Sequence, residues 1–266
     1  MGGPAASRLI GLAGAGPEQG RRVQLFEGGA GPPLLYLHGA GTYGWMPVHD
    51  LLARERRVVL PVHPGFGASE GSDAIETIED LVFHTLDVLD ALGLERADVA
   101  GLSLGGWLAA ELALRHPDRV GRLILVDAAG VRLPGVPMGD VFMVPPSQAR
   151  ALLFHEPDSD LARELLPDAP PPERMEAVLR AREAAARLLW NPAQHYRRLT
   201  GRLWRIKAPT LVVWGAEDRL IPRVYGEAWA RKVPRARLEV IERCGHLPPL
   251  ERPQRFAELA LAFLRD

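Results

Sequence analysis

The chain has 266 residues, with 32 Lys and Arg against 33 Asp and Glu, and a formal net charge of −1 at pH 7. This balance excludes the basic surface of a nucleic-acid-binding protein or of one attached to an anionic membrane. The single cysteine, Cys244, excludes an intrachain disulfide and a cysteine-rich metal site. We therefore expect a soluble, cytoplasmic protein with no nucleic-acid or membrane partner.

The first 20 residues are rich in Gly, Ala and Pro. They contain no basic segment followed by a sustained apolar run, which a secretion signal would need. We predict that they form a flexible lead-in without regular structure.

Short apolar runs of strand length alternate with helical patterns along the rest of the chain. The expected strands are residues 21–27, 33–37, 57–62, 97–102, 122–126, 210–214 and 237–241. The expected helices are residues 75–92, 104–115, 225–232 and 254–264. This alternation predicts an α/β fold with a mostly parallel central sheet that helices cover on both faces.

The alternation stops between Asp127 and Thr210. Residues 131–206 are first Pro-rich and then helical, with apolar side chains at helical spacing: Met175, Val178, Leu179, Leu188 and Leu189. We expect an inserted helical cap over residues 131–206, and a core domain built from residues 1–130 and 207–266.

A candidate nucleophile lies where the strand 97–102 turns directly into the helix 104–115, in the sequence Gly101-Leu102-Ser103-Leu104-Gly105. Such an elbow holds its central residue in a sparsely populated backbone conformation and leaves its side chain exposed above the sheet, so the neighbouring residues must be small. Ser103 is therefore the expected nucleophile. The backbone N–H of Leu104, at the helix N-terminus, would stabilise an oxyanion.

A serine nucleophile needs a base, and the base needs an acid that orients it. Ligand-facing residues of a parallel sheet follow the carboxyl ends of its strands. Asp218 follows the strand 210–214 and His246 follows the strand 237–241, and the order Ser, Asp, His is the one that this elbow architecture uses. Asp127, at the end of the strand 122–126, is the alternative acid.

Three further motifs resemble those of the α/β-hydrolase superfamily: His38-Gly39-Ala40-Gly41, Pro64-Gly65-Phe66-Gly67-Ala68-Ser69 and Gly245-His246-Leu247-Pro248-Pro249. The resemblance covers residues 31–264 apart from the cap. It implies an α/β-hydrolase fold with the cap between its sixth and seventh strands, catalysis by Ser103, Asp218 and His246, and the backbone N–H of Ala40 as the second oxyanion donor.

Neither a cofactor nor a metal is expected. Residues 39–44 form a G-x-G-x-x-G pattern, but the next strand ends without the acidic residue that a dinucleotide-binding unit requires. The chain has no H-E-x-x-H motif or His-Cys cluster that would indicate a metal hydrolase.

The substrate pocket is expected to be largely apolar and to suit esters of small or medium size. The residues assigned to it are His38, Gly39, Gly41, Tyr43, Trp45, Trp190 and Leu247, whereas Trp107 is assigned to the core. We therefore predict a carboxylesterase that forms an acyl-enzyme and has a small-molecule ester as its partner. A homodimer is left open.

Two other functions stay open. One branch of the superfamily hydrolyses carbon–carbon bonds in ring-opened aromatic products, the 2-hydroxy-6-oxo-dienoates, and shares the Cys244-Gly245-His246 motif and a helical cap. It usually has Asn before the serine and Trp after the histidine, where this chain has Leu102 and Leu247. The carboxylate-binding arginine expected in its cap has several candidates here: Arg174, Arg180, Arg182, Arg187, Arg197 and Arg198. The other function is that of a ligand-binding member without catalysis.

Overall fold

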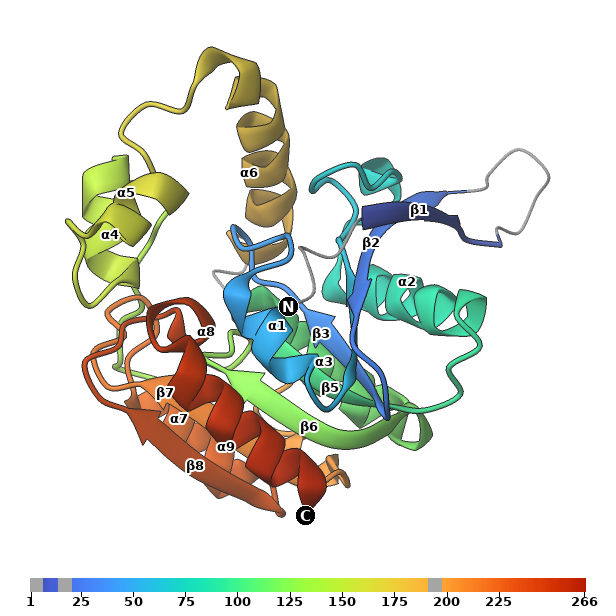
Figure 1. Cartoon of the computed structure of the whole chain (residues 1–266). Helices are drawn as coiled ribbons and strands as arrows, with labels where there is room; N and C mark the ends of the chain where they lie inside the picture. The colour runs from blue at the N-terminus through green and yellow to red at the C-terminus, as the bar shows by residue number, and fades with distance from the viewer. Residues whose placement is uncertain (1–6, 14–20, 191–197) are drawn as a thin grey trace.

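A computed structural model describes residues 7–13, 21–190 and 198–266 of the chain, and its centre is an eight-stranded sheet (Figure 1). The strand order is β1-β2-β4-β3-β5-β6-β7-β8. The strands are β1 (Ser7–Gly11), β2 (Arg22–Gly28), β3 (Pro33–Leu37), β4 (Arg57–Pro61), β5 (Ala97–Leu102), β6 (Val120–Val126), β7 (Thr210–Gly215) and β8 (Ala236–Ile241).

Parallel pairing joins β4, β3, β5, β6, β7 and β8, whereas β2 is antiparallel to both of its neighbours, β1 and β4. All six residues of β7 are buried, as expected of a parallel strand that is covered on both faces. The carboxyl ends of β5, β6, β7 and β8 therefore lie next to one another along one edge of the sheet.

Helices cover the sheet on both faces (Figure 1). On one face α1, α8 and α9 contact one another, and on the other α3 and α7 contact the sheet while α2 packs on α3. The bounds are α1 (Pro47–Leu52), α2 (Ile78–Ala91), α3 (Leu104–Arg115), α4 (Pro146–Leu153), α5 (Asp160–Leu165), α6 (Met175–Leu189), α7 (Val224–Lys232), α8 (Pro248–Glu251) and α9 (Pro253–Arg265).

The helices α4, α5 and α6 lie between β6 and β7 in the chain and project beyond the sheet (Figure 1). This arrangement confirms the predicted fold class, including the position of the helical cap between the sixth and seventh strands. The division of the chain at residues 130 and 207 stays a prediction.

The sequence-based prediction was wrong about part of the N-terminal segment. Residues 7–11 form β1, which pairs with β2 at the edge of the sheet, and Ile10 is the one buried side chain of this strand. An edge strand with a single buried residue lacks the apolar pattern by which the other strands were found. The rest of the predicted lead-in, apart from residues 12 and 13, lies outside the described residues.

None of the helices in the described residues combines the length and the apolar character needed to cross a bilayer. The cytoplasmic location stays a prediction.

Candidate active site

Ser103 lies at a sharp turn between β5 and α3, with φ 53° and ψ −112°. The two glycines of the elbow are required by close backbone contacts. A Cβ atom on Gly105 would lie 2.0 Å from the carbonyl oxygen of Leu37, and one on Gly101 would lie 2.1 Å from the carbonyl oxygen of Gly105. These contacts and the positive φ agree with the elbow predicted from the sequence.

His246 and Asp218 form a buried pair. Asp218 Oδ2 lies 2.7 Å from His246 Nδ1, and Asp218 Oδ1 accepts the backbone N–H groups of Leu220 and Ile221 at 2.8 Å each. Nδ1 therefore carries the proton of a neutral imidazole, which leaves Nε2 as an acceptor. Nε2 is buried and has no hydrogen-bond partner among the described residues, and His246 lines the same cavity as Ser103.

The loop that carries His246 is fixed to the cap. The backbone N–H of His246 donates to the carbonyl oxygen of Leu153 at 2.7 Å. Glu251 accepts the backbone N–H of Gly245 at 2.8 Å and that of His155, in the cap, at 2.7 Å. The cap and the histidine loop are thus joined at the edge of the cavity.

The predicted oxyanion loop lines the cavity through Gly39, Ala40 and Gly41. Thr42, which the sequence did not single out, closes this loop, because its Oγ1 accepts the backbone N–H of Gly39 at 3.1 Å. The N–H of Leu104 belongs to the first turn of α3, where helix N–H groups have no partner within the helix. Both expected oxyanion donors therefore lie on elements that border Ser103.

His38 and His63 stack beneath the oxyanion loop, with ring centroids 3.9 Å apart. His38 Nε2 accepts the backbone N–H of His63 at 2.9 Å, and His63 Nε2 lies 3.2 Å from the carbonyl oxygen of His38. Burial lowers the pKa of His63 to about 4 and that of His38 well below its ordinary value. Both rings are therefore neutral at neutral pH and hold the loop through hydrogen bonds.

The cavity has a volume of about 380 Å³, and Ser103 and His246 lie in its wall. Tyr43 and Leu247 line it as expected. Most of the other lining side chains are apolar and come from the cap: Val141, Phe142, Val144, Leu153, Phe154, Leu165, Leu166, Val178 and Leu189. The sequence identified the cap but could not show which of its side chains face Ser103.

His38, Trp45 and Trp190 were expected in the pocket, but they are not among the described residues that line it. His38 is buried behind the loop. Trp45 donates to Asp50 and packs against His49, and Trp190 is 55% exposed on another part of the cap. Trp107 is buried in the core as expected.

Two of the cap arginines line the cavity, Arg174 and Arg182. Arg182 donates to the carbonyl oxygen of Phe142 at 2.7 Å, whereas the guanidinium of Arg174 has no hydrogen-bond or ion-pair partner among the described residues. Arg180 and Arg187 donate instead to backbone carbonyls of the core, at Gly67 and Ser72.

The structure does not add the other two candidate cap arginines, Arg197 and Arg198, to the cavity lining. Arg198 lies outside the cavity lining, and Arg197 lies outside the described residues. Arg174 and Arg182 are thus the cap arginines that a bound anion would meet.

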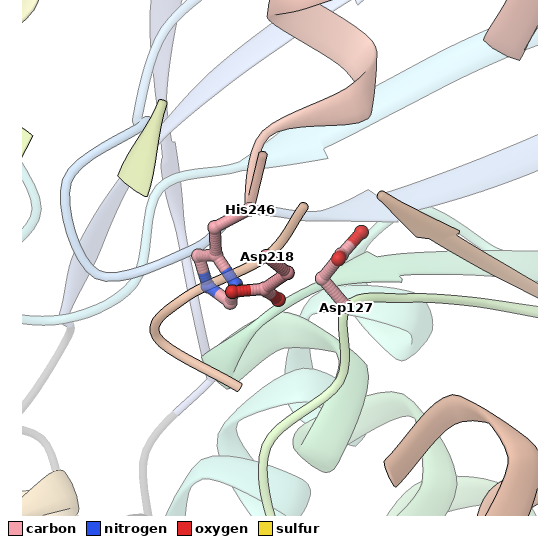
Figure 2. A group of neighbouring side chains, drawn as sticks. All are labelled: Asp127, Asp218 and His246. Atoms are coloured by element: carbon pink, nitrogen blue, oxygen red, sulfur yellow. The ribbon is translucent and has the colours of Figure 1, made fainter. Parts of the chain in front are cut away.

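Asp127 completes a cluster with Asp218 and His246, in which one carboxylate oxygen or ring nitrogen of each lies within 4.8 Å of the others (Figure 2). The three side chains come from the loops that follow β6, β7 and β8. His246 Nδ1 bonds to Asp218, so the geometry favours Asp218 over Asp127 as the direct partner of the imidazole.

The model of the Alpha/beta hydrolase family matches residues 34–259. The chain belongs to this family. A relative over nearly the whole length is the 2-hydroxymuconate semialdehyde hydrolase of Pseudomonas sp. (strain CF600), which is 36% identical over 93% of this chain and 92% of its own. A 2-hydroxy-6-oxononadienedioate/2-hydroxy-6-oxononatrienedioate hydrolase of Burkholderia vietnamiensis is 33% identical over 98% of this chain and 96% of its own.

Among solved structures, a membrane phospholipase A is 27% identical, with a TM-score of 0.77 over 98% of this chain and 86% of its own. The chain is thus a hydrolase of the alpha/beta hydrolase family. The carboxylesterase prediction is wrong, because these relatives, 33–36% identical over nearly the whole chain, are named as hydrolases of 2-hydroxymuconate semialdehyde and of 2-hydroxy-6-oxo compounds. The names of these relatives agree better with the alternative, a carbon–carbon bond hydrolase.

Proposed function

We propose that the protein hydrolyses a carbon–carbon bond of a ring-opened aromatic product of the 2-hydroxy-6-oxo-dienoate class. The observation that carries this proposal is the 36% identity to a 2-hydroxymuconate semialdehyde hydrolase over 93% of the chain. The cavity agrees with such a substrate, because a dienoate is an apolar chain that ends in a carboxylate, and the wall is apolar with two arginines.

Ser103, His246 and Asp218 have the roles of nucleophile, base and orienting acid in this proposal. His246 Nε2 takes the proton of Ser103 Oγ, and Oγ attacks the C6 carbonyl carbon of the substrate. The N–H groups of Leu104 and Ala40 stabilise the resulting oxyanion. Asp218 holds the imidazole tautomer and stabilises its charged form, consistent with the 2.7 Å contact to Nδ1.

Breaking a carbon–carbon bond requires a place for the electron pair. A proton added at C5 converts the dienol to its 2-oxo tautomer. When the oxyanion re-forms a carbonyl, the C5–C6 bond breaks and its electron pair is delocalised through the C3–C4 double bond onto the C2 oxygen, which takes up a proton. Water then hydrolyses the acyl group on Ser103 and releases a carboxylic acid, while the rest of the substrate leaves as a 2-hydroxydienoate.

Arg174 is the expected partner of the substrate carboxylate. A planar guanidinium can hold a carboxylate through two parallel charge-assisted hydrogen bonds. Arg182 is held in part by its bond to the carbonyl oxygen of Phe142, whereas no donor of the Arg174 guanidinium has a partner among the described residues, which favours Arg174 for this role.

The test measures the turnover of 2-hydroxymuconate semialdehyde through the loss of its absorbance. In parallel, it measures the hydrolysis of p-nitrophenyl esters of increasing acyl length. We expect turnover of the dienoate that the Ser103→Ala variant loses, with at least about a thousandfold drop in kcat and an unchanged fold. An inert dienoate beside rapid ester turnover would refute the proposal. If the wild type turns over neither substrate and no serine-reactive phosphonate labels Ser103, the protein is a ligand-binding member of the family.

A further inference from the structure

Asp127 lies directly after β6, between the strand that leads to Ser103 and the strand that leads to Asp218. Its backbone N–H donates to the carbonyl oxygen of Val213 at 3.0 Å, and its side chain is fully buried. Its φ of 41° lies in the left-handed region, which is unfavourable for a residue with a Cβ atom. Backbone strain of this kind concentrates at functional sites.

The polar contacts of the two aspartates differ. Asp127 Oδ1 accepts the backbone N–H of Gly215 at 3.1 Å, and Asp127 Oδ2 has no hydrogen-bond donor among the described residues. Asp218 accepts three donors, the N–H groups of Leu220 and Ile221 and the Nδ1–H of His246. One carboxylate oxygen of Asp127 lies within 4.8 Å of an oxygen of Asp218 and of a ring nitrogen of His246, and all three side chains are buried (Figure 2).

Two ionised carboxylates would repel each other strongly in this buried position. The titratable groups that face Asp127 in the described structure are Asp218, His246, Glu251 and Cys244. Burial, and then the neighbouring Asp218 carboxylate, raise the pKa of Asp127 well above its ordinary value. A carboxyl group that keeps its proton is a hydrogen-bond donor, and the neighbouring carboxylate that could accept from it is that of Asp218, within 4.8 Å.

We propose that Asp127 is a positioning residue: it stays protonated and donates a hydrogen bond to Asp218, which holds Asp218 against His246. The hydrogen bond also withdraws negative charge from Asp218. As a result, Asp218 stabilises the imidazolium form of His246 less than a carboxylate without this hydrogen bond would. The catalytic consequence rests on the proposed function, whereas the protonation of Asp127 does not.

The first measurement needs no substrate. Infrared spectroscopy at neutral pH should show the carbonyl band of a protonated carboxylic acid in the wild type, and this band should be absent from Asp127→Asn. Glu251 is the matched control, because burial also raises the pKa of this carboxyl group, so the band must survive in Glu251→Gln. A wild type without the band, or a band that Asp127→Asn retains, overturns the proposal.

The second measurement is the pH dependence of kcat and kcat/KM. Asp127→Ala should lower kcat about tenfold, with little change in KM, because one hydrogen bond to a charged group is lost. The fall of kcat at low pH, called the acidic limb of the profile, should also move to higher pH. Asp127→Asn, whose amide can still donate, should recover most of the lost kcat and keep the limb of the wild type. If Asp127 were ionised, both variants would move the limb to lower pH, because a negative charge beside His246 had been removed.

Failure of the two proposals can be told apart. A wild type that is inert toward dienoates refutes the proposed function. The positioning role can then still be tested, because an NMR titration of the His246 imidazole in the same variants takes the place of the pH dependence of kcat. An Asp127→Ala protein that folds and titrates like the wild type overturns the positioning role. If Asp127→Ala fails to fold, the infrared band and the NMR titration of Asp127→Asn decide.

Discussion

The backbone N–H of His246 donates to the carbonyl oxygen of Leu153, the last residue of α4, at 2.7 Å. Gly245 makes this approach possible, because a Cβ atom there would lie 2.4 Å from the same carbonyl oxygen. The cap therefore positions His246, the proposed general base, and also lines the cavity.

Glu251 strengthens this connection, since it accepts N–H groups from both sides of it. Glu251→Ala should lower the free energy of unfolding by about 2 kcal/mol, because two part-buried hydrogen bonds to its carboxyl group are lost. The turnover of the dienoate should fall as well, because the histidine loop loses a fixed partner. Urea unfolding and steady-state kinetics measure both effects.

The matched control for Glu251 is Glu258→Ala on α9, an exposed residue whose ion pair with Arg255 should contribute less than about 1 kcal/mol. Equal stability losses in the two variants would contradict the role of Glu251.

Arg174→Gln should raise KM for the dienoate by at least about tenfold, because a charge-assisted pair of hydrogen bonds to the substrate carboxylate is lost. A neutral ester lacks that carboxylate, so its KM should change little in the same variant. Arg163→Gln, an exposed cap arginine paired with Asp158 outside the cavity lining, is the control. A KM for the dienoate that stays at the wild-type value in Arg174→Gln would place the carboxylate elsewhere.

Gly105→Ala should lower the free energy of unfolding by about 3 kcal/mol or more, because its Cβ would meet the backbone of Leu37, which has no freedom to move away. Gly11→Ala is the matched control, since a Cβ atom there would have no heavy atom of the described residues within 4 Å apart from those of its own chain neighbours. Thermal and denaturant unfolding should separate the two variants clearly. A Gly105→Ala protein as stable as Gly11→Ala would show that the turn at Ser103 can accommodate a Cβ atom at position 105, which would contradict the prediction.

His84, on α2, makes stability depend on pH. Burial lowers its pKa from 6.5 to about 3, and neither ring nitrogen has a hydrogen-bond partner among the described residues. Between these two values the unfolded chain binds a proton that the folded chain does not. His84 therefore does not destabilise the folded protein through protonation above pH 6.5. Below that pH, the free energy of unfolding falls by about 1.4 kcal/mol for each pH unit, until the pH reaches the pKa of the folded state.

His84→Leu should flatten this dependence between about pH 4 and pH 6, and should stabilise the protein at neutral pH by removing two unpaired buried nitrogens. Denaturant unfolding at several pH values measures both changes. Parallel stability curves for the wild type and the variant would contradict the prediction.

The parts of the site that depend on local geometry could be predicted from the sequence. The strand, glycines and helix around Ser103 specify an elbow over a few residues, and the loops with Asp218 and His246 follow their strands directly. The residues that line the cavity were harder to predict from the sequence, because the direction of a side chain depends on contacts between distant segments. Trp45, just before α1, donates to Asp50 on that helix, and Trp190 is exposed and is not among the described residues that line the cavity.

The type of bond was mispredicted because two single positions were given too much weight. Leu102 and Leu247 replace the Asn and Trp expected of carbon–carbon hydrolases, and this favoured esters. Both side chains lie in the cavity wall, so they shape the space around a substrate. They leave the pairing of His246 with Asp218 in place, and identity over the whole chain is the stronger indicator of the reaction.

Ser103, Asp127, Asp218 and His246 follow four strands that are neighbours in the sheet, although about 140 residues separate the first from the last in the sequence. A refolding chain cannot place these side chains together until β5, β6, β7 and β8 have all paired. Long-range parallel pairing is slow to form. The recovery of activity after denaturation is therefore a kinetic signal for the completion of the sheet, and it should lag behind the early return of helical structure.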